Sequence, residues 1–212
     1  METRILSADD PSALAAALEI LRQGGVIAFP TDTVYGVGAH AFRPEAVERL
    51  YVAKGRPTEK AIPLLIASAD DLPLVATEVS EVARWLAARF WPGGLTLVVS
   101  RHPCVPDAVS PGPTVAVRAP DHHCPLALIA ALGAPLAATS ANLSGQPSPL
   151  TADHVLAQLG GRVALILDGG PCPGGVPSTV IDVTVDPPVV LRHGALSAET
   201  IHAALQDLRE EG

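Results

Sequence analysis

Hydroxyl-bearing and cationic side chains recur at the ends of the apolar segments of this chain. In open α/β sheets, ligands bind in crevices beyond the strand ends. We therefore expect these side chains to line one polar cavity, although Ser, Thr and Asn are, taken singly, also ordinary turn residues. The set comprises Thr31, Asp32, Thr33, Arg118, Thr139, Ser140, Asn142, Ser178, Thr179 and Arg192.

The lysines of the chain are confined to one short stretch. The sequence contains 12 arginines but only two lysines, and Lys54 and Lys60 both lie in the segment KGRPTEK. Lysine is a compact point charge, whereas arginine is a planar fork, so the two are not interchangeable at a binding site. Composition alone leaves chance placement on a solvated helix end as an equal explanation.

Such a set of residues is suited to anionic ligands. Arginine meets carboxylates and phosphates through paired hydrogen bonds, and lysine can neutralise a phosphate or a small anion. The ligands implied are an amino-acid carboxylate and a nucleotide. Catalysis at such a site works through positioning and charge stabilisation, as in phosphoryl and nucleotidyl transfer.

Several common catalytic motifs are missing from the sequence. There is no G-x-x-x-x-G-K-[ST] phosphate loop, no G-x-G-x-x-G opening a helix after the first strand, and no G-x-S-x-G elbow. The segments 102–104 and 122–124 contain His and Cys, but they lack a paired C-x-x-C and lie in proline-rich stretches. We therefore expect no metal site built by the protein.

Composition narrows the class of protein. The 212 residues are 48% hydrophobic with a net charge of −8, which argues against a broad phosphate-tracking surface. The N-terminus METRILSADD does not read as a signal peptide, and no apolar run reaches the roughly 18 residues of a membrane span. Three cysteines, Cys104, Cys124 and Cys172, without a close pair favour a reduced, cytoplasmic setting.

Hydrophobic periodicity predicts the elements that must position these side chains. Helices are expected over 13–22, 44–54, 78–90, 125–133 and 151–161, followed by a last helix capped by Ser197. Strands are expected over 25–29, 62–68, 95–100, 114–119, 134–142, 163–170, 178–184 and 189–194. Helices and strands alternate at first and strands dominate later, which predicts one domain of the α/β class with a mixed sheet.

Seven motifs then occur in a recognisable order: PTDTVYGVG, KGRP, WPGGLTLVV, TVAVRAP, TSANLSGQPSP, PSTVID and VLRHG. In this order they resemble the YrdC-type L-threonylcarbamoyladenylate synthases, over roughly residues 12–194. The resemblance implies a twisted mixed sheet with flanking helices and a wide, positively charged concave cavity. The chain stops soon after LRHG, so we expect the short form: one domain over 1–212 with a C-terminal helix over 197–209.

The resemblance implies an activity and its partners. The family condenses L-threonine, bicarbonate or CO2, and ATP to L-threonylcarbamoyladenylate and pyrophosphate. The product serves the threonylcarbamoyl modification of adenosine 37 in tRNA, which a separate transferase complex completes. ATP would be a substrate, with Mg²⁺ bridging its phosphates, and direct tRNA binding would be weak or absent.

The resemblance also implies roles for individual residues. Lys54 and Arg56 correspond to the catalytic basic pair, which faces the phosphates and the carbonate-derived group. Contacts with L-threonine correspond to Thr33, Arg118 and Ser178. Contacts with ATP correspond to Arg56, Lys60, Thr114, Ser140, Asn142, Ser148 and Arg192. Leu65 departs from the family pattern, because some members carry a histidine there. Asp32 could assist the chemistry or cap its turn.

Other functions remain open at this point. An RNA-binding or ribosome-maturation module of the same fold would need an extended basic face, against which the net charge of −8 weighs. A carbamoyl-transfer domain would need further domains for carbamoyl phosphate. A stand-alone binding protein would remain if Lys54 and Arg56 proved dispensable.

Overall fold

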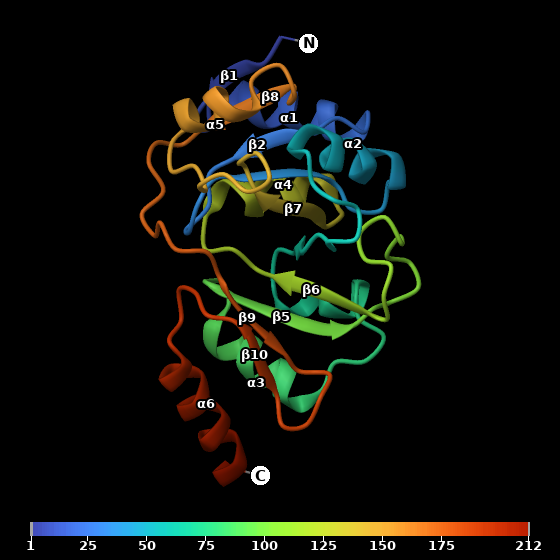
Figure 1. The fold of residues 1–212 in the computed structure, drawn as a ribbon, viewed down its shortest axis with the longest axis vertical. Helices are drawn as coiled ribbons and strands as arrows, with labels where there is room; N and C mark the ends of the chain where they lie inside the picture. Colours follow the sequence, from blue (N-terminus) through green and yellow to red (C-terminus); the bar gives the residue numbers. More distant parts are fainter. Residues whose placement is uncertain (1, 212) are drawn as a thin grey trace.

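The fold is described from a computed structural model of the chain, over residues 2–211. These residues form a ten-stranded sheet, six α-helices and one 3-10 helix (Figure 1). The helices are α1 (Pro11–Arg22), α2 (Pro44–Lys54), η1 (Ala69–Leu74), α3 (Glu81–Phe90), α4 (His123–Leu132), α5 (Ala152–Leu159) and α6 (Ala198–Glu211). The strands are β1 (Arg4–Ser7), β2 (Ile27–Phe29), β3 (Gly36–His40), β4 (Leu64–Leu65), β5 (Leu95–Ser100), β6 (Thr114–Arg118), β7 (Leu136–Ser140), β8 (Leu165–Asp168), β9 (Thr179–Asp182) and β10 (Val189–Arg192).

The sheet is mixed, as predicted. Its strand order is β1-β8-β2-β3-β7-β4-β6-β5-β9-β10. The sheet contains parallel pairs, such as β2 with β8 and β5 with β9, and antiparallel pairs, such as β3 with β7 and β5 with β6. The two-residue strand β4 lies between β7 and β6, antiparallel to the first and parallel to the second. Figure 1 shows β2 and β7 in an upper group of strands and β6 and β5 in a lower group. Strand β4 pairs with one strand of each group, β7 and β6.

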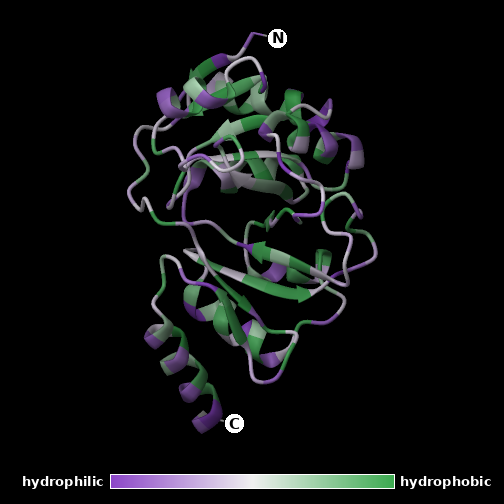
Figure 2. Ribbon diagram, viewed as in Figure 1, coloured by the Kyte–Doolittle hydropathy of each residue, from purple (hydrophilic) through white to green (hydrophobic). Residues whose placement is uncertain are grey.

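Two apolar cores lie on opposite faces of the sheet, because successive side chains of a strand point to opposite sides. Ile27 and Phe29 belong to a cluster with residues of α1 and α4. Ala28 between them belongs to a larger cluster with residues of α2, α3 and α5. Figure 2 shows β5 and β6 as largely hydrophobic, whereas the helices carry both hydrophobic and hydrophilic residues. Among the described residues, none of the helices is both long and apolar enough to cross a membrane.

Local signals explain where the helices begin and end. The side chain of Ser80 accepts a hydrogen bond from the backbone N–H of Ala83 at the start of α3. Thr151 does the same for His154 at the start of α5, as predicted. These caps satisfy N–H groups that have no partner within the helix. Gly55 ends α2 with φ +61°, a conformation that favours glycine.

The sequence-based prediction misses β1, β3 and the 3-10 helix η1, and it shifts several boundaries. The helix expected over 78–90 begins at Glu81, and the strand expected over 62–68 shortens to Leu64–Leu65. Strand β1 is a short and mostly exposed edge strand, so its hydrophobic pattern is weak. Strand β3 has the sequence GVGAH, whose two glycines disfavour a strand. It forms because β2 and β7 pair with it on both sides.

Gly38 of β3 is required by close packing. A Cβ atom there would lie 3.0 Å from the carbonyl oxygen of Ala137 and 3.1 Å from Cε1 of Phe29. We expect Gly38→Val to lower the free energy of unfolding by about 1–3 kcal/mol, because overpacked cores shift backbone and rotamers. Denaturant unfolding measures this change. Gly112→Val is the matched control, since nothing lies within 4 Å of its Cβ position, and equal losses in both variants would contradict the packing explanation.

Candidate active site

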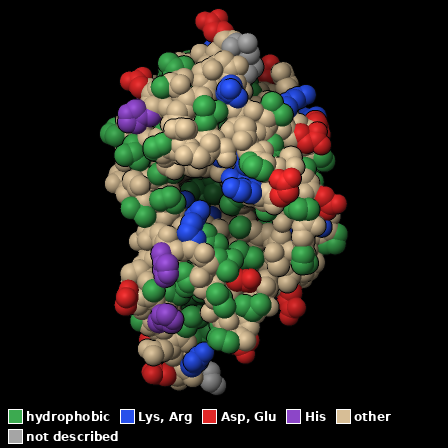
Figure 3. Space-filling view, in the orientation of Figure 1, with side chains coloured by type: hydrophobic (Ala, Val, Ile, Leu, Met, Phe, Trp, Pro, Cys, Tyr) green, Lys and Arg blue, Asp and Glu red, His purple; other side chains and the backbone are tan. Residues whose placement is uncertain are grey.

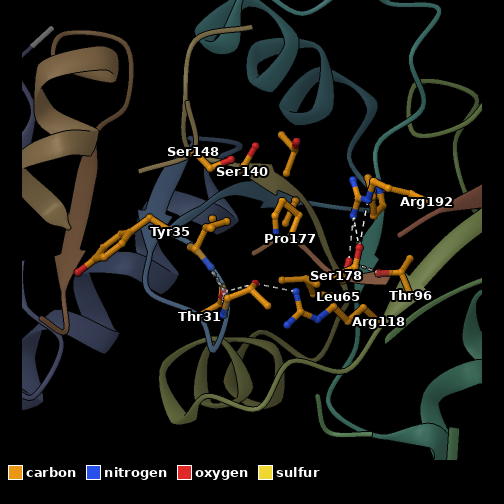
Figure 4. A pocket seen from close by; sticks show the side chains of 16 residues that line it. Thr31, Tyr35, Leu65, Thr96, Arg118, Ser140, Ser148, Pro177, Ser178 and Arg192 are labelled. Atoms are coloured by element: carbon orange, nitrogen blue, oxygen red, sulfur yellow. Dashed lines mark hydrogen bonds between the residues drawn. The ribbon is translucent and has the colours of Figure 1, made fainter. Parts of the chain in front are cut away.

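A cavity of about 260 Å³ lies where the upper and lower groups of strands meet. Figure 3 shows the hollow near the middle of this face, with Lys or Arg side chains beside it, and Figure 4 shows the side chains that line it. Six of the site residues implied by the family resemblance line the cavity: Thr33, Arg118, Ser140, Ser148, Ser178 and Arg192. Thr31 and Thr139, which the strand-end pattern placed there, line it as well. The other lining residues are Val34, Tyr35, Gly36, Pro63, Leu65, Thr96, Ala138 and Pro177.

Arg118, at the end of β6, is the cationic side chain of the cavity that donates the most hydrogen bonds within the protein. Its side chain is nearly buried, and Nη2 lies 2.7 Å and 2.6 Å from the two carboxylate oxygens of Asp32. Nη1 donates to Oγ1 of Thr33 at 3.0 Å, and Nε donates to the carbonyl of Gly93 at 2.8 Å. Burial lowers the pKa of Arg118, while the charge of Asp32 opposes this effect. The guanidinium is therefore fixed in one orientation.

The polar stretch after β2 forms a fixed turn that presents Thr33. Oγ1 of Thr31 donates to the carbonyl of Val34 at 2.7 Å and accepts from the N–H of Thr33 at 3.1 Å. The two threonine hydroxyls also share a hydrogen bond of 3.0 Å. Both side chains are buried, so these bonds compensate for lost contact with water. The turn thus holds the Thr33 hydroxyl against Arg118.

A second cluster forms at the start of β9. Oγ of Ser178 shares a hydrogen bond of 2.7 Å with Oγ1 of Thr96, which projects from β5. Nη2 of Arg192 donates to the carbonyl and to Oγ of Ser178, at 2.8 Å and 3.1 Å. Partial burial and then the positive charge of Arg118 lower the pKa of Arg192. The two arginines therefore lie close enough to affect each other's charge, and both line the same cavity.

Lys54 lies behind the cavity wall rather than on it. It is 2% exposed, and its ammonium donates to the carbonyls of Ser140 and Asn142 at 2.5 Å and 2.8 Å and to Oδ1 of Asn142 at 3.1 Å. An ammonium has three N–H donors, so all of them are engaged. Burial, and then the charge of Arg56, lower the pKa of Lys54 to about 8. Lys54 thus holds the end of β7, where Ser140 reaches the cavity, together with the loop that follows.

Asn142 belongs to the same loop and also turns away from the cavity. Its Nδ2 donates to the carbonyls of Leu143 and Gln146 at 2.8 Å and 2.7 Å, and its Oδ1 accepts from the Ser140 hydroxyl. The backbone N–H of Leu143 donates to the side chain of Gln158 in α5. Asn142 therefore shapes the loop rather than lining the cavity.

The remaining expected residues also lie off the cavity lining. Arg56 donates to the carbonyls of Lys60 and Ala61, at 3.0 Å and 2.8 Å, and so closes its own loop. Lys60 is exposed. Thr114 begins β6, whereas Arg118 ends it, so the two lie at opposite ends of this strand.

Several lining residues were not among the expected site residues. Thr96 is a buried hydroxyl within the apolar strand LTLVVS, and this polar interruption is the signal that could have identified it. Leu65 and Ala138 add an apolar patch. Tyr35 lines the cavity, but its ring points away from the centre (Figure 4). Its hydroxyl donates to the carbonyl of Gly170 at 2.8 Å, outside the cavity.

The lining offers no carboxylate to a metal ion. Within residues 2–211, no group of three or more His, Cys, Asp or Glu side chains is placed to hold one. The cavity presents hydroxyls, backbone groups and two arginines instead. These donors do not fit a protein-held Mg²⁺, which would have to be coordinated by the phosphates of a nucleotide.

The fold and this cavity define a class of protein: a mixed α/β domain with an arginine-bearing polar cavity at the junction of two strand groups. A sequence profile of the Sua5/YciO/YrdC family, described as "Telomere recombination", matches residues 19–194. The chain belongs to this family, which confirms the resemblance found in the motifs.

Individual relatives agree with this assignment. The chain is 48% identical over 205 residues to the threonylcarbamoyl-AMP synthase of Bacillus subtilis, covering 94% of this chain and 58% of that protein. It superimposes on the crystal structure of P. abyssi Sua5 complexed with L-threonine with a TM-score of 0.90 and 44% identity, covering 96% of this chain and 60% of that one. For E. coli YciO the TM-score is 0.82 with 30% identity, covering 94% and 98%. The chain thus spans about six tenths of the length of the B. subtilis and P. abyssi proteins.

The pKa of Lys54 predicts a pH dependence of stability. The folded-state pKa of about 8 lies below the ordinary value of 10.5, so between these pH values the unfolded chain binds more protons. As pH rises through this window, we expect the wild type to gain up to about 3 kcal/mol of unfolding free energy relative to Lys54→Met, at about 1.4 kcal/mol per pKa unit.

Denaturant unfolding at a series of pH values measures this difference, in which the titration of all other groups cancels. Lys60→Met is the matched control, because it removes an exposed lysine from the same segment. Parallel curves for the wild type and Lys54→Met between pH 8 and 10.5 would show that the ammonium is not held at a lowered pKa.

Proposed function

We propose that this protein is an L-threonylcarbamoyl-AMP synthase, a nucleotidyltransferase that uses L-threonine, bicarbonate or CO2, and ATP. The observation that carries the proposal is the cavity itself, in which Arg118, Thr33 and Ser178 converge from distant parts of the chain beside Arg192. The names of the B. subtilis and P. abyssi relatives support it. The product would serve tRNA modification through a separate transferase complex.

The geometry suggests how the two substrates divide the cavity. The carboxylate of L-threonine binds Arg118, with the hydroxyls of Thr33 and Ser178 nearby. The phosphates of ATP bind towards Arg192, with Ser140 and Ser148 on the same wall. Guanidinium groups are suited to this task because they donate charge-assisted hydrogen bonds to oxyanions.

The reaction requires no covalent intermediate with the protein. The threonine amine combines with bicarbonate to give a carbamate with loss of water. A carbamate oxygen then attacks the α-phosphorus of ATP, a P–O bond forms, and pyrophosphate leaves with the electrons of the broken bond. The fixed orientations of Arg118 and Arg192 contribute by positioning the reactants and by stabilising the negative charge that they carry.

The basic segment 54–60 has a supporting role in this proposal. Lys54 positions the loop of Ser140 from behind and need not touch the phosphates. The cavity of about 260 Å³ is small for both substrates together, since pockets for single drug-sized ligands span about 300–1,000 Å³. Arg56 and Lys60 would contact the part of the nucleotide that extends out of the cavity. Thr114, which does not line the cavity, would likewise contact only that outer part of the nucleotide.

The direct test is pyrophosphate release by purified protein from ATP and bicarbonate, with and without L-threonine. We expect release to depend on L-threonine and an adenylate of threonylcarbamate to be detected by mass spectrometry. Release without threonine, or no release although both substrates bind, would contradict the proposed activity.

Arg118→Gln tests the carboxylate site. Removing the guanidinium should raise the KM for L-threonine at least about tenfold, because a charge-assisted hydrogen bond to the carboxylate is lost. The KM for ATP should change much less. Arg84→Gln, an exposed arginine on α3, is the matched control. Equal changes in both KM values would mean that Arg118 supports the fold of the cavity rather than one substrate.

A further inference from the structure

Most of the hydrogen-bonding capacity of Arg118 is used inside the protein. A guanidinium has five N–H donors. Nε donates to Gly93, Nη2 faces both oxygens of Asp32, and Nη1 donates to Thr33. Only one N–H, on Nη1, is left for a ligand in the cavity. The carboxylate of Asp32 is itself fixed, since it also accepts from the backbone N–H of Asp121 at 3.1 Å.

The two arginines of the cavity differ in their balance of charge. Arg118 is paired with the carboxylate of Asp32, whereas Arg192 donates to the neutral carbonyl and hydroxyl of Ser178. No ion pair of Arg192 is found within residues 2–211. The net positive charge of the cavity therefore lies at Arg192, and the end formed by Arg118 is close to neutral.

We propose that Asp32 determines specificity: it cancels the charge of Arg118, so that this end of the cavity accepts the carboxylate of a zwitterionic amino acid and rejects phosphate and pyrophosphate. An arginine fork alone binds carboxylate and phosphate alike. The carboxylate of Asp32 repels a polyanion more strongly than a zwitterion, because Coulomb energy scales with charge. The identity of the zwitterion rests on the function proposed above.

This exclusion has a consequence for the reaction. Without Asp32, Arg118 and Arg192 would present two unpaired guanidinium groups to the same space. ATP or the pyrophosphate product could then span both and occupy the amino-acid site. Building repulsion against the wrong ligand is a common route to specificity.

The experiment measures the binding of pyrophosphate by calorimetry to the wild type, Asp32→Asn and Asp121→Asn, without ATP or Mg²⁺. Asp121 is exposed and contacts Asp32 only through its backbone N–H, so the control removes the same charge next to the ion pair but leaves the pair intact. We expect Asp32→Asn to bind pyrophosphate at least about tenfold more tightly than the wild type. Pyrophosphate should compete with L-threonine in this variant and not in the wild type.

Two further measurements guard against a purely structural effect. The double variant with Asp32→Asn and Arg118→Gln should lose the gain in pyrophosphate affinity, because no guanidinium remains at this position. Removing one partner of a buried ion pair lowers stability, so melting temperatures are recorded alongside. Pyrophosphate should raise the melting temperature of Asp32→Asn more than that of the wild type.

Equal pyrophosphate affinity and equal thermal shifts in the wild type and Asp32→Asn would overturn the proposal, as would an equal gain in Asp121→Asn. The result is also separable from the function proposed above. If the wild type binds no L-threonine while Asp32→Asn gains pyrophosphate binding, the charge balance stands and the proposed activity falls. If the wild type binds L-threonine but Asp32→Asn gains no pyrophosphate affinity, the proposed role of Asp32 falls and the proposed activity stands.

Discussion

The two-residue strand β4 is the constraint on which the cavity depends. Leu64 and Leu65 pair with β7 on one side and with β6 on the other, so this short strand completes the sheet between its two groups. Beside this strand, the cavity is lined by the ends of β6 and β7, at Arg118 and Ser140, and by the start of β3, at Gly36. The side chains directed into that space are polar where they can bind one another and apolar at Leu65 and Ala138.

Two buried cations stabilise the walls of this space in different ways. Lys54 donates to carbonyl and amide oxygens, and burial, followed by the charge of Arg56, lowers its pKa to about 8. Arg118 is paired with a carboxylate, which compensates for the burial of its charge. Lysine suits the first environment because a point charge can donate in three directions, and arginine suits the second because its fork donates to several partners at once.

The sequence predicts the class of fold and most of the strands and helices, because burial and capping leave regular patterns along the chain. It does not predict β3, whose glycines depend on β2 and β7 for their conformation. The motifs also predict six of the residues around the cavity. They do not predict that Lys54 and Asn142 bond to the loop after β7, because the direction of a side chain depends on tertiary contacts that motif position does not encode. The contact of these two residues with a ligand stays a prediction.

The segment between β8 and β9 explains why the Asp32 turn keeps its shape. This segment crosses from the upper to the lower group of strands, and its backbone bonds to both (Figure 1). The N–H of Gly175 donates to the carbonyl of Thr33, and the N–H of Ala195 donates to the carbonyl of Pro177. A Cβ atom at Gly174 would lie 2.7 Å from the carbonyl oxygen of Asp32, so only glycine allows the segment to pass this close. The segment thus packs the turn against Arg118, and the charge balance of the cavity depends on a backbone contact made by residues that carry no charge.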